Sequence, residues 1–211
     1  MTLLTPIDAV AQQDAVKAID LHKQYHGGKR QAIDIGANVG FWTKDFCETF
    51  EKVIAFEPIP SNVECLKKNV PNTNLEIKEY ALGARKQDTD IFFPQNGNSG
   101  SATFSPSNLV DESEIQKVPT KIRTLDDELS NVSEELAQNC LIKIDVQGYE
   151  KEVLDGAQKF ILNFRPIICL EIQKPRKRHK WIKFFGYTHG YRPLMSIKKD
   201  WTFVCYNKFP D

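Results

Sequence analysis

Short apolar runs and amphipathic stretches alternate along most of the chain. Four apolar runs are typical of buried strands: residues 32–35, 52–57, 141–146 and 166–172. Three amphipathic stretches follow such runs and predict helices: residues 41–50, 61–70 and 149–162. This alternation predicts an α/β fold, in which right-handed crossovers join the parallel strands of one doubly wound sheet.

The remaining segments complete this picture at both ends of the chain. A helix is predicted at residues 11–25, and His26 with the two glycines after it ends that helix. A strand is expected at residues 74–80 and a helix at residues 176–185. Residues 191–197 and 201–207, joined by a short polar turn, predict a terminal hairpin. Ser61 and Glu64 have the spacing of a capping box at the start of the helix at residues 61–70.

Residues 85–123 depart from this rhythm. Short strands are predicted at residues 91–93 and 118–125, with a loop rich in Gly, Ser and Asn between them. The stretch has too few apolar residues for a core of its own, so we interpret it as a small β insertion. We therefore expect an N-terminal helical extension at residues 1–28 and a single domain at residues 29–211.

Composition narrows the classes of partner and environment. The chain has 211 residues, 41% of them hydrophobic, and its 28 Lys and Arg balance 28 Asp and Glu. With zero net charge, the chain gives no indication of an overall electrostatic field that would attract nucleic acid or a membrane surface. The five cysteines form no C-x-x-C pair, so neither a zinc site nor a disulfide framework is indicated. With no signal peptide and no apolar run of membrane-spanning length, a cytoplasmic location is expected.

A glycine-containing turn follows the first apolar strand. Its order is D-x-G-x-N-x-G, formed by Asp34, Gly36, Asn38 and Gly40. Glycine lets a backbone come close to a bound ligand, and the start of the next helix suits an anionic group. The spacing does not match the dinucleotide fingerprint G-x-G-x-x-G, which makes a nicotinamide oxidoreductase the least favoured enzyme class. Glu57 ends the second strand, close to the offset of about 20 residues at which an acid meets ribose hydroxyls.

Together the motifs resemble an FkbM-type S-adenosylmethionine (SAM)-dependent methyltransferase. The matching pieces run from D-I-G-A-N-V-G at residues 34–40 through F-E-P at 56–58, A-L-G at 81–83, T-L-D at 124–126, L-I-K-I-D-V-Q-G-Y-E at 141–150, G-A at 156–157 and L-E-I at 170–172. The resemblance implies a Rossmann-like class I fold. Its seven-stranded, mostly parallel sheet has the order 3-2-1-4-5-7-6, with strand 7 antiparallel and helices on both faces. One residue departs from the family pattern, because Gln147 stands where D-V-E-G would place an acid.

The strand ends and the resemblance together give the candidate site. The expected cofactor is SAM, and the residues expected to bind it are Asp34, Gly36, Asn38, Gly40, Glu57, Pro58, Leu82, Ser101 and Asp145. The expected catalytic residues are Asp145 and Glu171, with Glu150 and His179 as further candidates for the base that takes a proton from a hydroxyl. For Asp145 the alternative is a carboxylate that caps the next helix or organises its loop. Residues 95–107, which include Ser101, are either a lid or a plain flexible loop.

The resemblance implies O-methylation, with a hydroxyl on a sugar, glycan or small metabolite as acceptor. The basic run at residues 174–180 leaves a nucleic-acid methyltransferase as an alternative, although a solvated helix face explains it as well. Gln147 leaves open a SAM-binding module without catalysis. His22 and His26 have metal-ligand spacing on a helix, but no third ligand lies nearby in the sequence, so no metal site is expected and a frayed polar helix end is favoured.

Overall fold

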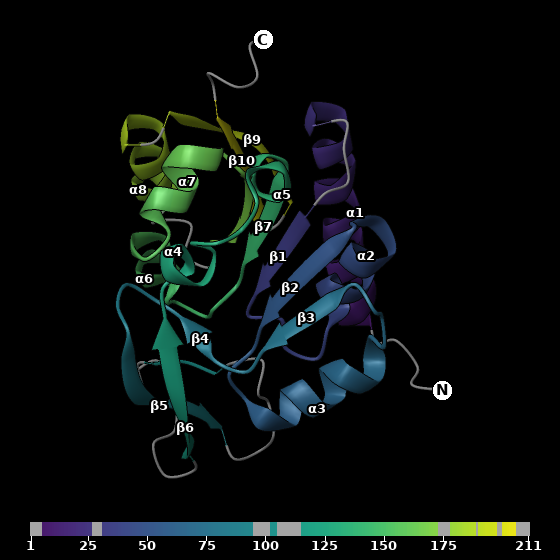
Figure 1. Cartoon of the computed structure of the whole chain (residues 1–211), viewed down its shortest axis with the longest axis vertical. Helices are drawn as coiled ribbons and strands as arrows, with labels where there is room; N and C mark the ends of the chain where they lie inside the picture. Colours follow the sequence, from purple (N-terminus) through teal and green to yellow (C-terminus); the bar gives the residue numbers. More distant parts are fainter. Residues whose placement is uncertain are drawn as a thin grey trace.

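A central sheet of seven strands organises the molecule (Figure 1). The computed structural model describes residues 6–26, 31–94, 102–104, 115–172, 178–188, 190–197 and 200–205. The strands of the main sheet are β1 (Gln31–Ile35), β2 (Lys52–Phe56), β3 (Leu75–Lys78), β7 (Cys140–Ile144), β8 (Ile167–Glu171), β9 (Tyr191–Ile197) and β10 (Asp200–Cys205). Their order is β3-β2-β1-β7-β8-β10-β9, and β10 is antiparallel to both neighbours. The predicted strand order and the antiparallel seventh strand are confirmed.

Successive residues of the inner strands face two separate hydrophobic cores. In β1, Ala32 belongs to one core and Ile33 to the other, and Val53 and Ile54 divide in the same way in β2. Because side chains alternate across a strand, a sheet covered on both faces needs apolar residues at every position. The continuous apolar runs in the sequence have this cause.

Helices cover both faces of the sheet (Figure 1). One core contains residues of α1 (Pro6–His26), α2 (Phe41–Thr49) and α3 (Pro60–Asn69). The other contains residues of α4 (Leu125–Glu128), α5 (Glu134–Gln138), α6 (Glu150–Asp155) and α7 (Gln158–Phe164), and α8 (Arg178–Lys183) and the π-helix η5 (Phe184–Thr188) pack against it. This arrangement agrees with the predicted helices on both faces.

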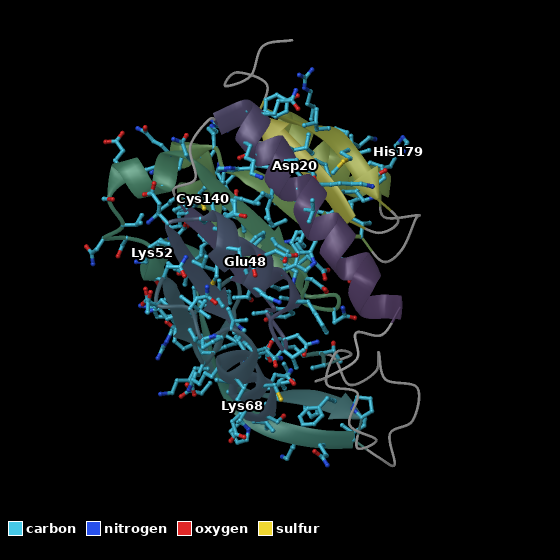
Figure 2. The ribbon with its side chains drawn as sticks, turned by 90° about the vertical axis from the view of Figure 1, so that its right-hand side faces the viewer. Asp20, Glu48, Lys52, Lys68, Cys140 and His179 are labelled. Carbon is cyan, nitrogen blue, oxygen red and sulfur yellow. The ribbon has the colours of Figure 1, made fainter. Side chains whose placement is uncertain are left out.

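Helix α1 is packed into the molecule along its C-terminal half. Figure 2 shows α1 lying across α2, with Asp20 on its outer side. Ala15, Ala18 and Ile19 are buried in the core that α2 shares. His22 is also fully buried, and its Nε2 lies 3.0 Å from the carbonyl oxygen of Asn139, just before β7. The interpretation of His22 as part of a frayed polar helix end is therefore wrong, because this side chain joins the helix to the sheet.

The β insertion forms a second, smaller sheet. It consists of β4 (Ala81–Leu82), β6 (Ile115–Arg123) and β5 (Gln87–Pro94), in that order. β5 and β6 are longer than the predicted strands because they pair with each other over eight residues, from Gln87 to Pro94. The division into an extension at residues 1–28 and a domain at residues 29–211 stays a prediction.

Two local predictions about helices are wrong. The helix expected at residues 149–162 is broken into α6 and α7 at Gly156. A Cβ atom on Gly156 would lie 2.0 Å from the carbonyl oxygen of Gly83, so this backbone packs directly against the chain after β4. The carboxylate of Asp126 then accepts hydrogen bonds from the backbone N–H groups of Lys159 and Phe160 in the first turn of α7.

The second error concerns the start of α3. Ser61 lies inside the helix, because α3 begins at Pro60 with Ile59 as its N-cap and without a side-chain cap. Proline fits the first helical position, since its missing N–H would be unpaired there anyway. The backbone N–H of Ile59 donates instead to Glu57, at 3.0 Å.

Two findings bear on the expected environment. Among the helices in the described ranges, none has the length and apolar character needed to cross a bilayer. Cys47, Cys65, Cys140 and Cys169 are free thiols. Burial raises the pKa of the Cys47 thiol to about 12, so this cysteine is a core residue without thiolate character.

Candidate active site

A cavity lies where the carboxyl ends of β1, β2 and β7 meet the small sheet. This edge is the expected ligand site of an open α/β sheet. The lining residues come from the loops after these three strands, from α3, β4 and β5, and from the segment at residues 102–104. They are Ile35, Gly36, Asn38, Phe56, Glu57, Pro58, Ile59, Asn62, Ala81, Leu82, Ile91, Ala102, Phe104, Asp145, Val146 and Gln147.

The loop after β1 needs its glycines for two different contacts. Gly36 has φ +78°, and a Cβ there would lie 1.9 Å from the carbonyl oxygen of Asp145 at the end of β7. Gly40 has φ +99°, and a Cβ there would lie 2.6 Å from Leu66 of α3. Asn38 has φ +51°, in the left-handed region that asparagine adopts more readily than most residues with a side chain. The loop is thus held between β7 and α3.

Glu57 is a buried acceptor at the wall of the cavity. Its Oε2 accepts from the backbone N–H of Asn38 at 2.8 Å. Its Oε1 accepts from the backbone N–H of Ile59 at 3.0 Å and from the side-chain amide of Asn62 at 3.1 Å. Burial raises the pKa of this carboxyl above its ordinary value, while the three hydrogen bonds and the charge of Lys143 oppose the rise. A carboxylate has about four acceptor positions, so Oε2 has room for one more donor.

Asp34 lies behind the loop and is fully buried. Its Oδ1 lies 3.1 Å from the ammonium of Lys143, and its Oδ2 accepts from the hydroxyl of Thr43 at 2.7 Å. Lys143 also donates to the carbonyl oxygen of Gly36 at 2.8 Å. Asp34 therefore acts on the loop through Lys143, which orients the loop from behind.

Asp145 and Glu171 are joined by the side chain of Gln147. The Gln147 amide nitrogen donates to Asp145 Oδ1 at 2.7 Å and to Glu171 Oε2 at 3.2 Å. Gln147 has φ +51°, which is uncommon for a residue with a side chain. Its hydrogen bonds to Asp145 and Glu171 are consistent with a backbone held in this strained conformation. Asp145 Oδ2 lies 4.0 Å from the Lys143 ammonium. Asp145 does not cap α6, whose N-cap is Tyr149 without a side-chain hydrogen bond.

The predicted site residues fall into three groups. Gly36, Asn38, Glu57, Pro58, Leu82 and Asp145 line the cavity. Asp34 and Gly40 lie behind the loop, and Glu171 reaches the cavity through Gln147. Ser101 and most of the expected lid lie outside the described residues, although Ala102 and Phe104 line the cavity.

The two other candidate bases do not line this cavity. Glu150 is buried, and its carboxylate accepts from the backbone N–H of Gly148 at 2.8 Å. His179 lies at the end of the molecule opposite α3, as Figure 2 shows by its distance from Lys68. Of the four candidate bases, Asp145 is thus the one that lines the cavity.

Sequence reasoning missed several residues of the site. Lys143 interrupts an apolar strand. A charged residue in such a run needs a buried partner, so the sequence could have predicted the ion pair with Asp34. Asn62 was overlooked because Ser61 fitted a capping box. Ile91 and Phe104 belong to the insertion. No local sequence pattern predicts where the insertion packs against the sheet. Among the described residues, no group of three or more His, Cys, Asp or Glu is arranged to hold a metal ion.

Comparisons with known proteins agree with this geometry. The chain is 28% identical over 142 residues to "Methyltransferase 1" of Beauveria bassiana, covering 59% of this chain and 57% of that protein. It is 30% identical over 130 residues to the "Hexuronic acid methyltransferase AglP" of Haloferax volcanii, covering 58% of this chain and 48% of that one. The chain therefore spans about half the length of these curated relatives.

Solved structures show the same fold at low sequence identity. The methyltransferase FkbM from Methylobacillus flagellatus matches 94% of this chain and 57% of its own with a TM-score of 0.52 and 15% identity. The METTL16 methyltransferase domain matches 97% of this chain and 70% of its own with a TM-score of 0.56 and 13% identity. The fold is thus the α/β class I methyltransferase fold. The sequence profile of the methyltransferase FkbM domain matches residues 34–196, well over half of the chain, and the protein therefore belongs to the FkbM methyltransferase family.

Proposed function

We propose that this protein transfers a methyl group from SAM to a hydroxyl of a carbohydrate. The observation that carries the proposal is the single cavity in which the glycine loop, Glu57 and Asp145 meet. It combines a loop suited to a small anionic ligand, an acceptor suited to ribose and an acid suited to proton transfer.

The residues fit the parts of SAM. Glu57 Oε2 has one remaining acceptor position, which suits one ribose hydroxyl. Phe56, Pro58, Leu82 and Ile91 give apolar contact area for the adenine ring. The backbone of residues 36–40 leads into α2, whose start suits the carboxylate of the amino-acid part.

The chain's own residues then act on the acceptor. SAM supplies a methyl carbon made electrophilic by positive sulfur. Asp145 takes the proton of the acceptor hydroxyl as the oxygen–carbon bond forms and the carbon–sulfur bond breaks. The Gln147 amide donates to Asp145 Oδ1, which orients the carboxylate for the acceptor hydroxyl, and the Lys143 ammonium lies 4.0 Å from Oδ2.

A carbohydrate acceptor is favoured by one comparison. AglP is named as a hexuronic acid methyltransferase, and it is 30% identical to this chain. Because the match spans about half of that protein, its acceptor enters here as part of the proposal.

The first test is calorimetric titration with SAM, S-adenosylhomocysteine and NAD. Both adenosyl ligands are expected to bind in preference to NAD. Glu57→Gln is expected to weaken them roughly 10- to 100-fold, since a charge-assisted hydrogen bond is replaced by a weaker one. The matched control is Glu64→Gln, an exposed acid on α3 that is expected to change nothing. Binding of NAD alone, or no adenosyl binding, would contradict the proposal.

Turnover is tested separately with Asp145→Asn. Release of S-adenosylhomocysteine is measured with a panel of p-nitrophenyl glycosides. The variant is expected to lose at least about 100-fold in kcat while keeping its affinity for S-adenosylhomocysteine. Unchanged kcat would remove Asp145 from the mechanism.

A further inference from the structure

A second cavity lies between the start of α6 and the segment formed by α8 and η5. The described residues that line it come from these two regions. They are Gly148, Glu150, Lys151, Glu152, Lys180, Trp181 and Phe184. Nothing in the proposed binding of SAM uses this cavity.

The two cavities are lined by consecutive residues of the chain. Gln147 lines the first cavity and Gly148 lines the second. The amide of Gln147 holds Asp145, while the N–H of Gly148 holds Glu150. A ligand in the second cavity therefore lies next to the turn that positions the proposed base.

Trp181 and Phe184 give this cavity an aromatic wall. Both rings are half-buried and pack against the main core, with Trp181 6.0 Å from Phe184 and 6.3 Å from Phe185 between ring centroids. The wall continues into a π-helical turn at Phe184, a feature often found at functional sites. A ring anchored in this way presents a rigid apolar face at little entropic cost, which suits stacking against the C–H face of a sugar.

The cavity is lined by two carboxylates, Glu150 and Glu152, and by two ammonium groups, Lys151 and Lys180. Glu150 is buried and oriented by Gly148, so its carboxylate is placed to accept from hydroxyls. Lys151 is engaged by Asp155 on its own helix. Lys180 is exposed beside Trp181, and in the described ranges no carboxylate forms an ion pair with it. Lys180 is thus the cation best placed to meet an acid group of a ligand.

We propose that this second cavity is the acceptor site, and that it takes a sugar ring bearing a carboxylate. The ring stacks on Trp181, its carboxylate meets Lys180, and one of its hydroxyls reaches Asp145 past the Gln147–Gly148 turn. This inference rests on the proposed function, since it names where the methyl acceptor binds and which charge it carries.

The experiment measures both binding and turnover with p-nitrophenyl β-D-glucuronide and the uncharged p-nitrophenyl β-D-glucoside. The protein is first loaded with S-adenosylhomocysteine for calorimetry, then assayed with SAM. Lys180→Gln is expected to raise KM for the glucuronide about tenfold and to leave the glucoside unchanged. Trp181→Leu is expected to weaken both about tenfold, whereas Trp181→Phe retains most of the binding.

The matched control is Lys183→Gln. Lys183 lies on the same helix, but it lines a different cavity together with His179. It is expected to leave both ligands unaffected. None of these changes is expected to alter the affinity for S-adenosylhomocysteine.

Each remaining outcome is decisive. Absence of S-adenosylhomocysteine binding in the wild type would overturn the proposed function. Glucuronide turnover that is insensitive to Trp181 and Lys180 would leave that function standing and place the acceptor elsewhere. Failure of the loaded wild type to bind the glucuronide, or equal loss of both glycosides in Lys180→Gln, would overturn the acidic-sugar inference.

Discussion

Lys143 is a charged side chain inside the central sheet, where a charge is costly without a partner. It is almost fully buried, and its ammonium lies 3.1 Å from Asp34 and 2.8 Å from the carbonyl oxygen of Gly36. At the scale of single residues, this lysine connects the sheet to the loop that forms the cavity. Its value to the protein is positional, since a buried ion pair adds little net stability compared with apolar side chains.

Removing Lys143 is expected to leave the Asp34 charge buried and uncompensated. Lys143→Met should therefore lower the free energy of unfolding by about 3–5 kcal/mol, measured by urea denaturation. The control is Lys52→Met, because Lys52 lies on β2 in an exposed 3.4 Å pair with Glu76 and should cost below about 1 kcal/mol. A second variant, Asp34→Asn with Lys143→Met, should recover part of the loss. Equal costs at Lys143 and Lys52 would contradict the role of this pair.

Glu57 gives the second prediction at this scale. Burial raises the pKa of its carboxyl above the ordinary value of 4.5, so protonation begins at a higher pH than for an exposed acid. Because a protonated carboxyl offers less to a ribose hydroxyl, affinity for S-adenosylhomocysteine should fall as pH is lowered through the range, above 4.5, in which this carboxyl takes up its proton. Calorimetry across this range should show that Glu57→Gln loses this pH dependence and that Glu64→Gln keeps it.

The same shift has the opposite sign for stability. The folded-state pKa of Glu57 is raised, so the folded protein holds this proton more tightly than the unfolded chain. The stability contributed by the carboxyl is therefore present below pH 4.5 and is lost as pH rises through the raised value. Ligand binding thus favours the ionised form of Glu57, whereas folding favours its protonated form. Such a conflict is expected for a buried acid in a binding site.

At the scale of elements, the break between α6 and α7 depends on one close contact. Gly156→Ala would bring a Cβ to 2.0 Å from the carbonyl oxygen of Gly83, so the backbone must shift. The expected cost is about 1–3 kcal/mol, seen as a lower Tm in thermal unfolding. Gly186→Ala is the control, because its Cβ would find no atom closer than 3.6 Å. A Tm for Gly156→Ala equal to that of the control would show that the backbone adapts without strain.

This break also shows which features of the helices and strands the sequence can predict. The strands, their order and most helices were predictable, because each carries its own periodicity and the motifs fit one family. The interruption at Gly156 was not predictable, since its causes are Gly83 and the carboxylate of Asp126, distant in sequence. The same holds for the site. Glu57 and Asp145 stood out at strand ends, whereas the contact of Gln147 with Glu171 spans 24 positions.

At the scale of the whole molecule, the two faces of the sheet are covered by different sets of helices. The proposed SAM cavity lies at the carboxyl edge of the sheet, where Asn62 of α3 helps to line it, and the proposed acceptor cavity lies on the side of α6 and α8. The opposite face is closed by α1, α2 and α3 (Figures 1 and 2). Because the loop at residues 36–40 joins β1 to α2, the packing of that closed face supports the position of this loop, which we propose binds the cofactor.

Helix α1 is therefore expected to be a structural layer of the domain. Ala18 is fully buried against the core of α2, while Val16, two positions earlier, is 48% exposed. Ala18→Glu would place an unpaired charge in that core and should lower the free energy of unfolding by about 3 kcal/mol or more, measured by urea denaturation. Val16→Glu adds the same charge to the same helix at the surface, and should change stability within about 0.5 kcal/mol. If both variants are equally stable, α1 is a detachable extension. If only Ala18→Glu is destabilised and also loses affinity for S-adenosylhomocysteine, α1 and the loop at residues 36–40 are parts of one cooperative unit.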